Sequence, residues 1–258
     1  MKIHPTAIIS EKARLTEDVC IGPYSVIGDG VTIGQGTVIG AHCVIENRTA
    51  IGKRCQVFTG AVLGSTPQDL KYKSEVSYLE IGDENIIREY VTINPGTEAN
   101  SKTILGNNNM IMAYSHIAHN CVIGNNCIIA NCGTLAGYVS IEDKAIVGGM
   151  VAIHQFSRVG SLSIIGGCSK VVSDVPPYST CDGHPARVYG LNLVGLKRQG
   201  LNSKTIKQIS HAFKILFNSG LSPRSALEKL KQIEYASTEI SHLIDFIKNS
   251  KRGVCRHC

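Results

Sequence analysis

The chain has 258 residues and a formal net charge of +6, with 43% hydrophobic and 18% charged residues. This length can bury a substantial core in one or two domains, and no run of about 18 apolar residues predicts a membrane span. Residues 1–185 hold 13 basic and 16 acidic side chains, whereas residues 186–258 hold 13 and 4, so the charge is concentrated at one end. The basic end indicates an acidic ligand or protein partner, or Lys-rich helices facing water; nucleic acid is not expected, because no binding motif accompanies the charge.

An aliphatic residue recurs at every sixth position along most of the chain. A helix period of 3.6 or a strand period of 2 would not select every sixth residue, whereas the short strands and tight turns of a hexapeptide β-helix do. The period predicts an all-β solenoid in which each aliphatic side chain points inward and stacks on its equivalent in the next coil. The periodic residues are Ile3, Ile9, Leu15, Ile21, Ile27, Ile33, Ile39, Ile45, Ile51, Val57 and Leu63, then Ile81, Ile87 and Ile93, then Leu105, Ile111, Ile117, Ile123, Ile129, Leu135, Ile141, Val147, Ile153, Val159, Ile165 and Val171.

Four of the ten cysteines lie two positions before a periodic aliphatic residue: Cys43, Cys55, Cys121 and Cys127. In most other coils this slot holds a small residue, so these cysteines are predicted to be small core fillers in a reducing compartment rather than a disulfide framework. The first residues of the chain lead directly into the repeat, without a basic and apolar leader. We therefore expect a cytoplasmic location.

The six-residue period is interrupted twice. Residues 65–73 and residues 94–101 are polar segments, and each contains a proline near its start. A solenoid accepts insertions only where the chain loops out of the wall, and such loops commonly lie on the functional face. Both segments are therefore candidate site loops.

The pattern changes near the C-terminus. The prolines at 176 and 177 are expected to close the solenoid, because proline cannot donate to a continuing ladder. From about Leu193 the apolar residues follow a helical period, with Ser222 and Pro223 as the start of one helix. We predict two domains, a β-helix over residues 1–190 and a helical domain over residues 191–258. The last four residues, Cys-Arg-His-Cys, resemble half a metal site, but a frayed end is the favoured interpretation.

Histidines are the main candidates for chemistry. His116 and His119 flank the inward Ile117, so both are expected to emerge from the wall, and His154 and Gln155 follow two coils later. An imidazole is suited to general-base catalysis at neutral pH. No nucleophile elbow, P-loop or dinucleotide fingerprint is present, so covalent and nucleotide-hydrolysing mechanisms have no support.

Two other interpretations of the histidines remain open at this point. Three histidines on a β-prism could hold zinc, as in the hydratases built on this architecture, which require three converging imidazoles and an open coordination position. His119 and His154 are 35 residues apart, one short of two complete 18-residue coils. A purely structural solenoid is the other interpretation, and it leaves the polar loop at residues 68–73 and the basic end without a purpose.

Several phrases distributed along the whole chain carry a resemblance to a known family. They are IGPYSVIG, PQDLKY, IGDENIIREYVTI, SHIAHNCVIGN, TLAG, GGMVAIHQF, IGGCSKVVSDVPPY and GLNLVGLKR, in this order. The chain resembles the UDP-N-acetylglucosamine O-acyltransferase family. PQDLKY and GLKR make the resemblance specific, because other hexapeptide acyltransferases share the repeat without these phrases.

The resemblance implies a left-handed parallel β-helix in a homotrimer, with active sites between neighbouring subunits. It also implies transfer of a (R)-3-hydroxyacyl chain from acyl carrier protein to the 3-hydroxyl of UDP-N-acetylglucosamine, the first step of lipid A biosynthesis. No cofactor and no metal are expected for this reaction. The pyrophosphate and the acidic carrier protein would then be the two anionic partners of the basic C-terminal region.

The resemblance also implies roles for individual residues. His119, the second histidine of HIAH, matches the general base, and the N–H of Gly137 in TLAG matches the donor that stabilises the oxyanion. Gly167 matches a position that limits acyl-chain length. The residues matched to substrate binding are Gln68, Asp69, Lys71, His116, His154, Gln155, Asn192 and Arg198.

Three positions depart from the common pattern of the family. Asn120 follows His119 where an aspartate is common, Tyr138 follows Gly137 where a histidine is common, and Gln199 replaces a second arginine. An amide can orient an imidazole but does not stabilise an imidazolium with a full charge, so a weaker base is expected. An acceptor sugar with an amine at position 3, which is a better nucleophile, is therefore kept as an alternative substrate.

Overall fold

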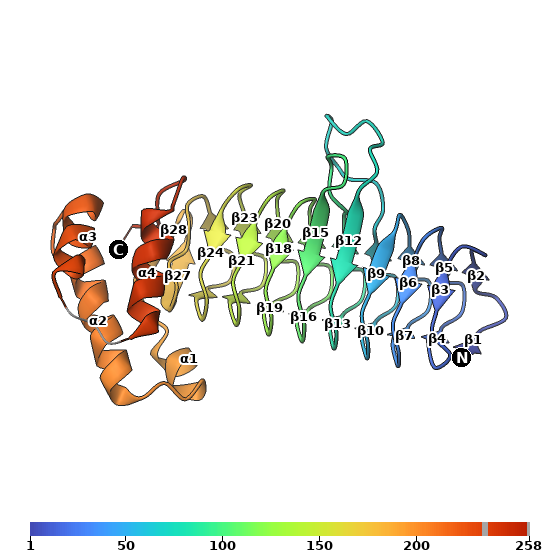
Figure 1. Cartoon of the computed structure of the whole chain (residues 1–258), viewed down its shortest axis with the longest axis horizontal. Helices are drawn as coiled ribbons and strands as arrows, with labels where there is room; N and C mark the ends of the chain where they lie inside the picture. Colours follow the sequence, from blue (N-terminus) through green and yellow to red (C-terminus); the bar gives the residue numbers. More distant parts are fainter. Residues whose placement is uncertain (234–236, 257–258) are drawn as a thin grey trace.

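The computed structural model describes residues 1–233 and 237–256. Its main body is a parallel β-solenoid of three sheets, with the N-terminus at one end and four helices at the other (Figure 1). Each strand pairs with the strand one coil further along, so that His116 and Ile117 lie opposite Thr134 and Leu135. The predicted all-β solenoid of hexapeptide repeats with a C-terminal helical region is confirmed.

The three sheets, here sheets A, B and C, form the three walls of the prism. Most strands have only two residues, because the chain turns a corner after each one. Sheet A has the order β1 (Lys2–Ile3), β4 (Cys20–Ile21), β7 (Val38–Ile39), β10 (Gln56–Val57), β13 (Ile86–Ile87), β16 (Met110–Ile111), β19 (Ile128–Ile129), β22 (Ile146–Val147), β25 (Ile164–Ile165), β27 (Ser179–Gly183) and β28 (Ala186–Leu191). Sheet B has the order β2 (Ile8–Ile9), β5 (Val26–Ile27), β8 (Val44–Ile45), β11 (Val62–Leu63), β14 (Thr92–Ile93), β17 (His116–Ile117), β20 (Thr134–Leu135), β23 (Ala152–Ile153) and β26 (Lys170–Val171). Sheet C has the order β24 (Arg158–Val159), β21 (Ser140–Ile141), β18 (Val122–Ile123), β15 (Lys102–Leu105), β12 (Tyr78–Ile81), β9 (Thr49–Ile51), β6 (Thr32–Ile33) and β3 (Arg14–Leu15).

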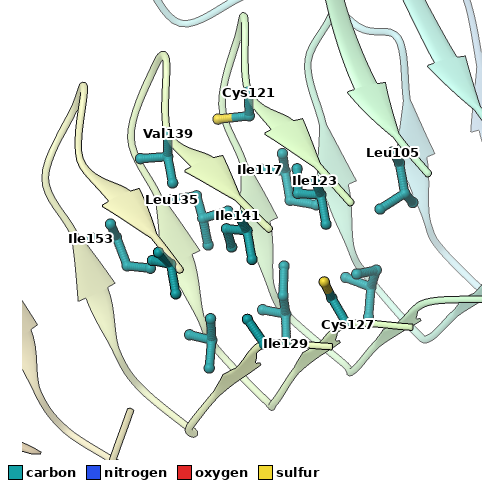
Figure 2. Packing of buried hydrophobic residues seen from close by; sticks show 14 of the residues in the cluster. Leu105, Ile117, Cys121, Ile123, Cys127, Ile129, Leu135, Val139, Ile141 and Ile153 are labelled. Atoms are coloured by element: carbon teal, nitrogen blue, oxygen red, sulfur yellow. The ribbon is translucent and has the colours of Figure 1, made fainter. Parts of the chain in front are cut away.

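The inward aliphatic residues form one core along the axis of the prism (Figure 2). The strand register places Ile117 between Ile93 and Leu135, and all three side chains are buried. Burying such a side chain contributes about 1.5–3 kcal/mol relative to leaving it exposed. Because nearly every coil repeats this contact, the core holds the wall in one register along its whole length.

The cysteines at the core slot are buried, as predicted. Burial raises the pKa of Cys121 to about 12 and that of Cys127 to about 11. Both thiols therefore stay protonated at neutral pH and act as small apolar side chains that fill the corners of the prism (Figure 2).

The corners of the prism explain the small residues that follow many aliphatic ones. A Cβ atom at Gly106 would lie 2.5 Å from the carbonyl oxygen of Gly124 in the next coil, so no side chain fits there. The second residue of most turns has a left-handed backbone, with φ of 59° at Asn120, 61° at Tyr138 and 63° at Phe156. This conformation costs a non-glycine residue roughly 1–2 kcal/mol, which the surrounding coil must offset.

Both interruptions of the period form loops that project together from one edge of the solenoid (Figure 1). They contact each other, since Asn94 Nδ2 donates to the carbonyl oxygen of Ser65 at 3.1 Å. The backbone N–H of Asn100 also donates to the carbonyl oxygen of Val76 at 2.7 Å. The two loops therefore support one another outside the wall.

Four helices follow the solenoid: α1 (Leu193–Arg198), α2 (Ser203–Phe217), α3 (Pro223–Lys231) and α4 (Thr238–Lys248). The predicted N-cap is confirmed, because the Ser222 side chain accepts from the N–H of Ser225. Helices α2, α3 and α4 pack on one another. The division into domains at residues 190 and 191 stays a prediction.

Helix α4 is attached to the end of the prism by a polar cluster. The Nε2 atom of His242 lies 2.9 Å from Glu142 Oε2, and its Nδ1 atom lies 2.8 Å from Tyr178 Oη. Burial raises the pKa of Tyr178, so its hydroxyl stays protonated. The Arg158 guanidinium lies 4.0 Å above the ring of Phe246 and donates to its carbonyl oxygen at 3.2 Å. The helical region is thus fixed to the last coils.

Two expectations for the C-terminal region are wrong. The sheet does not end at Pro176 and Pro177, because β27 continues sheet A parallel to β25 before β28 returns antiparallel. The chain end is not frayed as far as Arg256, because Cys255 is buried and its N–H donates to the carbonyl oxygen of Asp174 at 2.8 Å. The physical reason is that residues 253–255 pair with the edge that Asp174 offers. Residues 257 and 258 lie outside the described residues.

Candidate active site

A pocket of about 1160 Å³ lies at the corner of the prism that follows sheet B. Its wall comes from β17 and from the turns after β17, β20 and β23. Residues 68–71 of the first insertion, Glu75 shortly after it and residues 97–99 of the second insertion line its other sides. The two insertions therefore convert an open corner of the solenoid into a pocket.

Three predicted site residues occupy the same turn position in successive coils. His119, Gly137 and Gln155 are each 18 residues apart, and the strands before them pair in register. Neighbouring strands are about 4.7–4.9 Å apart, so the three residues form a row with this spacing along the corner. The row places a glycine directly beside the imidazole of His119.

The imidazole of His119 is held by Asn120. Its Nδ1 atom lies 2.9 Å from Asn120 Oδ1, which also accepts from the backbone N–H and the hydroxyl of Thr97, at 3.1 and 2.9 Å. The amide nitrogen of Asn120 donates to Glu98 Oε2 at 3.0 Å. This network fixes the orientation of the amide, because the opposite orientation would set its NH₂ group against the two Thr97 donors. Nδ1 of His119 therefore carries the proton, and the lone pair of Nε2 is free.

The carboxylate of Glu98 also binds Tyr138, whose hydroxyl donates to Oε1. This hydrogen bond holds the pKa of Glu98 below its usual value, so the carboxylate stays ionised. The ring of Tyr138 meets that of His119 edge-on, with centroids 5.4 Å apart, and stacks on Phe156 at 4.9 Å. The His119 side chain is consequently only 12% exposed.

The other imidazole nitrogen of His119 faces Asp69. The distance from Nε2 to Asp69 Oδ2 is 3.7 Å, which is too long for a direct hydrogen bond, so a hydroxyl or water that enters from the pocket can contact both atoms. The other Asp69 oxygen accepts the backbone N–H of Lys71 at 2.9 Å and so fixes the carboxylate.

His116 lies on β17 beside His119 and lines the same pocket. Its Nδ1 atom is 2.7 Å from Thr92 Oγ1. Burial and, to a smaller extent, the neighbouring His119 lower the pKa of His116. His116 is therefore neutral at neutral pH and can donate or accept one hydrogen bond without charge.

Gly137 is in direct contact with the His119 ring. A Cβ atom at this position would lie 2.5 Å from Cε1 and 2.6 Å from Nε2 of His119, so a glycine is required by space rather than by backbone angles. The N–H of Gly137 has no hydrogen-bond acceptor in the part of the chain that the structure describes. A neutral imidazole with a free Nε2 and a nearby unpaired N–H can together deprotonate a hydroxyl and stabilise an oxyanion.

Comparisons with known proteins agree along the whole chain. The family described as UDP-N-acetylglucosamine O-acyltransferase, domain 2, matches residues 174–255, and the bacterial transferase hexapeptide family matches residues 12–47 and 102–137. The acyl-[acyl-carrier-protein]–UDP-N-acetylglucosamine O-acyltransferase of Alkalilimnicola ehrlichii is 47% identical over 256 residues, which cover 99% of both chains. The protein of the same name from Thermodesulfovibrio yellowstonii is 50% identical over 256 residues, again 99% of both chains. The chain belongs to the UDP-N-acetylglucosamine O-acyltransferase family.

Solved structures of UDP-N-acetylglucosamine O-acyltransferases match this acyltransferase from end to end. The Moraxella catarrhalis structure superposes with a TM-score of 0.95 at 41% identity and covers 99% of this chain and 100% of its own. The Bacteroides fragilis structure superposes with a TM-score of 0.96 at 43% identity, with coverage of 98% and 99%. The resemblance based on sequence phrases is confirmed, and it includes the C-terminal helices.

Seven of the residues that the sequence predicts to act in this acyltransferase meet at the pocket. One group comes from the first insertion and the other from the wall, although up to 87 residues of sequence separate them. The seven are Gln68, Asp69, Lys71, His116, His119, Gly137 and Gln155.

The other four predicted residues of the acyltransferase do not line this pocket. His154 is exposed, with Nδ1 3.1 Å from the carbonyl oxygen of Gln155. Asn192 caps α1, because Oδ1 accepts from the N–H of Gly195 at 2.9 Å while Nδ2 donates to the carbonyl oxygen of Leu162. Arg198 is exposed at the end of α1, and Gly167 is exposed in the turn after β25. The roles implied for these four residues stay predictions.

Sequence reasoning missed Thr97, Glu98 and Phe156, and it treated Tyr138 only as a departure from the common pattern. All four line the pocket of the acyltransferase. The available signal was the interruption of the period at residues 94–101, which indicated a site loop without indicating which of its side chains would face the base.

Proposed function

We propose that the enzyme transfers a (R)-3-hydroxyacyl chain from acyl carrier protein to the 3-hydroxyl of UDP-N-acetylglucosamine, in the first step of lipid A biosynthesis. The relatives carry this acceptor and this donor in their names. The observation that carries the proposal is the pairing of a free Nε2 on His119 with the unpaired N–H of Gly137 in one pocket.

In the proposed reaction, Nε2 of His119 takes the proton of the sugar hydroxyl while its oxygen attacks the thioester carbonyl. General-base catalysis of this kind contributes about 10²–10⁴ in rate. The carbonyl oxygen becomes an oxyanion that accepts from the N–H of Gly137, worth about 10²–10³. The carbon–sulfur bond then breaks, and the thiolate of the carrier protein takes the proton back from the imidazolium.

The pocket also supports the implied roles in acceptor binding. Asp69 lies opposite Nε2, which places its carboxylate well to bind a sugar hydroxyl next to the reacting one. Lys71 offers a cation for the pyrophosphate, and neutral His116 offers a hydrogen bond.

The two alternative functions are not favoured. The relatives are named O-acyltransferases, which does not favour a 3-amino acceptor or a hydratase. Within the described residues there is no group of three or more His, Cys, Asp or Glu side chains that could hold a metal ion, as a hydratase of this architecture would need. An amine acceptor was considered because Asn120 makes His119 a weaker base. That reason loses force, because the carboxylate of Glu98 accepts a hydrogen bond from the amide of Asn120.

One assay tests the proposed function. The purified enzyme is given UDP-N-acetylglucosamine or its 3-amino analogue, each with a series of 3-hydroxyacyl and unsubstituted acyl carrier protein thioesters. We expect ester formation on the 3-hydroxyl of UDP-N-acetylglucosamine. If only the 3-amino analogue is acylated, the acceptor is the amino sugar rather than UDP-N-acetylglucosamine. If neither sugar is acylated, the proposed function is wrong.

We further propose that the enzyme is a cytoplasmic homotrimer with acyl carrier protein as its protein partner. Asn192, Arg198 and Gly167 lie outside the pocket, and the last two are exposed, which favours an assembly in which a neighbouring subunit brings such residues to the site. The basic region over residues 186–258 suits an acidic carrier protein. No helix among the described residues has the length and apolarity needed to cross a membrane.

Mixing two inactive variants is expected to restore activity if the site is shared between subunits. In trimers assembled from equal amounts of His119→Ala and Arg198→Ala chains, about one site in four combines an intact His119 with an intact Arg198 of the next subunit. Turnover should therefore recover to about a quarter of the wild-type value in co-expressed protein. No recovery, or a fully active monomer in sedimentation, would contradict a shared site.

Replacement of Gly167 is expected to change the preferred acyl-chain length. The left-handed residue of its turn is Cys168, with φ of 60°, and a Cβ at Gly167 would approach only the Gly149 carbonyl oxygen, at 3.3 Å. A side chain is therefore compatible with the backbone. An open groove should favour donors longer than 10 carbons, since each further buried methylene adds about 0.8 kcal/mol, nearly fourfold in selectivity. Gly167→Met should fill the groove and reverse that order in a thioester series.

The alternative role of Gly167 is purely that of a turn residue. In that case Gly167→Met would lower the rates for all donors by the same factor, with an unchanged chain-length profile. Gly167→Ala, which adds a single methyl group, is the matched variant and should shift the profile less than methionine.

A further inference from the structure

We propose that Glu98 is a positioning residue for the acyl transfer, which acts through Asn120 to hold His119 in the tautomer of a base and to place a negative charge behind it. The inference rests on the proposed function, because it assigns the support of the base that this function needs. Nothing in the sequence phrases or in the comparisons assigns a role to this residue.

The geometry forms a continuous chain of hydrogen bonds. Nδ1–H of His119 donates to Asn120 Oδ1 at 2.9 Å, and Asn120 Nδ2 donates to Glu98 Oε2 at 3.0 Å. The Thr97 donors fix one end of the amide and the Glu98 carboxylate fixes the other. Loss of the carboxylate would leave the NH₂ end of Asn120 without its acceptor, so the amide could turn and release Nδ1.

The charge on this chain comes only from Glu98. Asn120 is neutral and does not offset the positive charge that His119 acquires when it takes a proton, whereas an aspartate at position 120 would do so directly. Asp69 faces the opposite nitrogen, where the substrate hydroxyl has to enter. Tyr138 keeps Glu98 ionised by donating to its second oxygen. The asparagine and the tyrosine are thus joined by one carboxylate.

The backbone of the second insertion fixes the position of Glu98. Its N–H donates to Ser101 Oγ at 2.9 Å, and the Ser101 hydroxyl donates back to its carbonyl oxygen at 2.7 Å. The N–H of Asn120 donates to Thr103 Oγ1 at 2.8 Å, just after the same insertion. The loop and the turn that carries the base are therefore tied together at both residues, which a chance contact of an exposed glutamate would not require.

Replacement of the charge is expected to lower turnover without changing substrate binding. Loss of a partner that orients an active group costs about 10–100-fold, and Glu98 is partly open to solvent, so we expect about a tenfold lower kcat for Glu98→Gln. KM for both substrates should stay within about twofold, because Glu98 acts through the base rather than on the acceptor. Glu80→Gln is the matched control, since Glu80 forms an exposed ion pair with Lys102 and does not line the pocket.

The decisive measurement is rescue by moving the charge. The double variant Glu98→Gln/Asn120→Asp places a carboxylate directly on Nδ1, and it should return kcat to within about threefold of wild type. A purely structural role for Glu98 predicts no rescue, because the second substitution would add damage. Unchanged kcat in Glu98→Gln, or failure of the folded double variant to recover, overturns the inference. If the wild-type enzyme is active in the same assay, the proposed function stands even when the role of Glu98 is contradicted.

The tautomer of His119 can also be measured in the wild-type enzyme, so this test does not depend on whether a variant at position 98 folds. The ¹⁵N NMR shifts of histidine distinguish the two neutral tautomers, and the signal of His119 is identified by its loss in His119→Ala. We expect the Nδ1–H tautomer. The Nε2–H tautomer would show that Asn120 and Glu98 do not hold the ring as proposed.

Discussion

Replacement of His119 by alanine is expected to abolish most of the activity and leave the fold intact. The imidazole offers Nε2 toward Asp69, and its removal takes away the acceptor for the hydroxyl proton. We expect kcat to fall by about 10²–10⁴. The side chain leaves from a turn on the outside of the wall, while the inward Ile117 stays in place, so the thermal unfolding midpoint should change little.

Two comparisons make this result specific. His4→Ala is the control, since His4 is exposed in the first coil and far along the chain from the pocket. His116→Ala should mainly raise KM for the sugar nucleotide, because His116 is neutral and lies beside the base rather than in its place. Near-normal turnover of a folded His119→Ala enzyme would contradict the general-base mechanism.

Once the family resemblance has named the site residues, the fixed length of the repeat is enough to predict that three of them form a row. His119, Gly137 and Gln155 are 18 positions apart, so they hold equivalent places in successive coils. The stacked wall then requires that they be neighbours, and the structure places them in one pocket. Regular periodicity thus converts sequence distance into spatial distance, which few other folds allow.

The supporting network could not be predicted in the same way. Glu98 lies in an insertion that has no period, so its position depends on hydrogen bonds such as those with Ser101. Its partner Tyr138 comes from the wall 40 residues later. The handedness of the coil also has no sequence signal, because either hand would place an aliphatic residue inside at every sixth position.

The tail illustrates a different limit. Cys255 is a small apolar residue near the chain end, where fraying is common. It belongs to neither the helical pattern nor the six-residue pattern of apolar residues. Its burial depends on Asp174 at the end of the prism, whose carbonyl oxygen accepts from the N–H of Cys255 at 2.8 Å. A terminal segment is therefore ordered by an edge formed about 80 residues earlier, and no local pattern contains that information.

Gly137→Ala is expected to lower turnover nearly as much as loss of the base itself. The added methyl group would lie 2.5 Å from Cε1 of His119, and the ring cannot move away freely because Asn120 holds Nδ1 and Tyr138 closes its other side. A displacement of about 1 Å at a reacting group can cost 10²-fold, so kcat should fall by about 10²–10³. Steady-state kinetics would show this fall in kcat, with the acyl donor held at saturation.

Alanine keeps the backbone N–H, which separates displacement of the base from loss of the oxyanion donor. If the methyl group acts by moving the imidazole, Gly137→Ala should have little further effect in an enzyme that already carries His119→Ala, because the alanine at 119 leaves space for it. Gly149→Ala is the matched control: Gly149 holds the same turn position at another corner, and a Cβ there would lie 3.5 Å from the nearest atom, the Asn131 carbonyl oxygen. Wild-type turnover of Gly137→Ala would mean that the imidazole does not stand against Gly137 during the reaction.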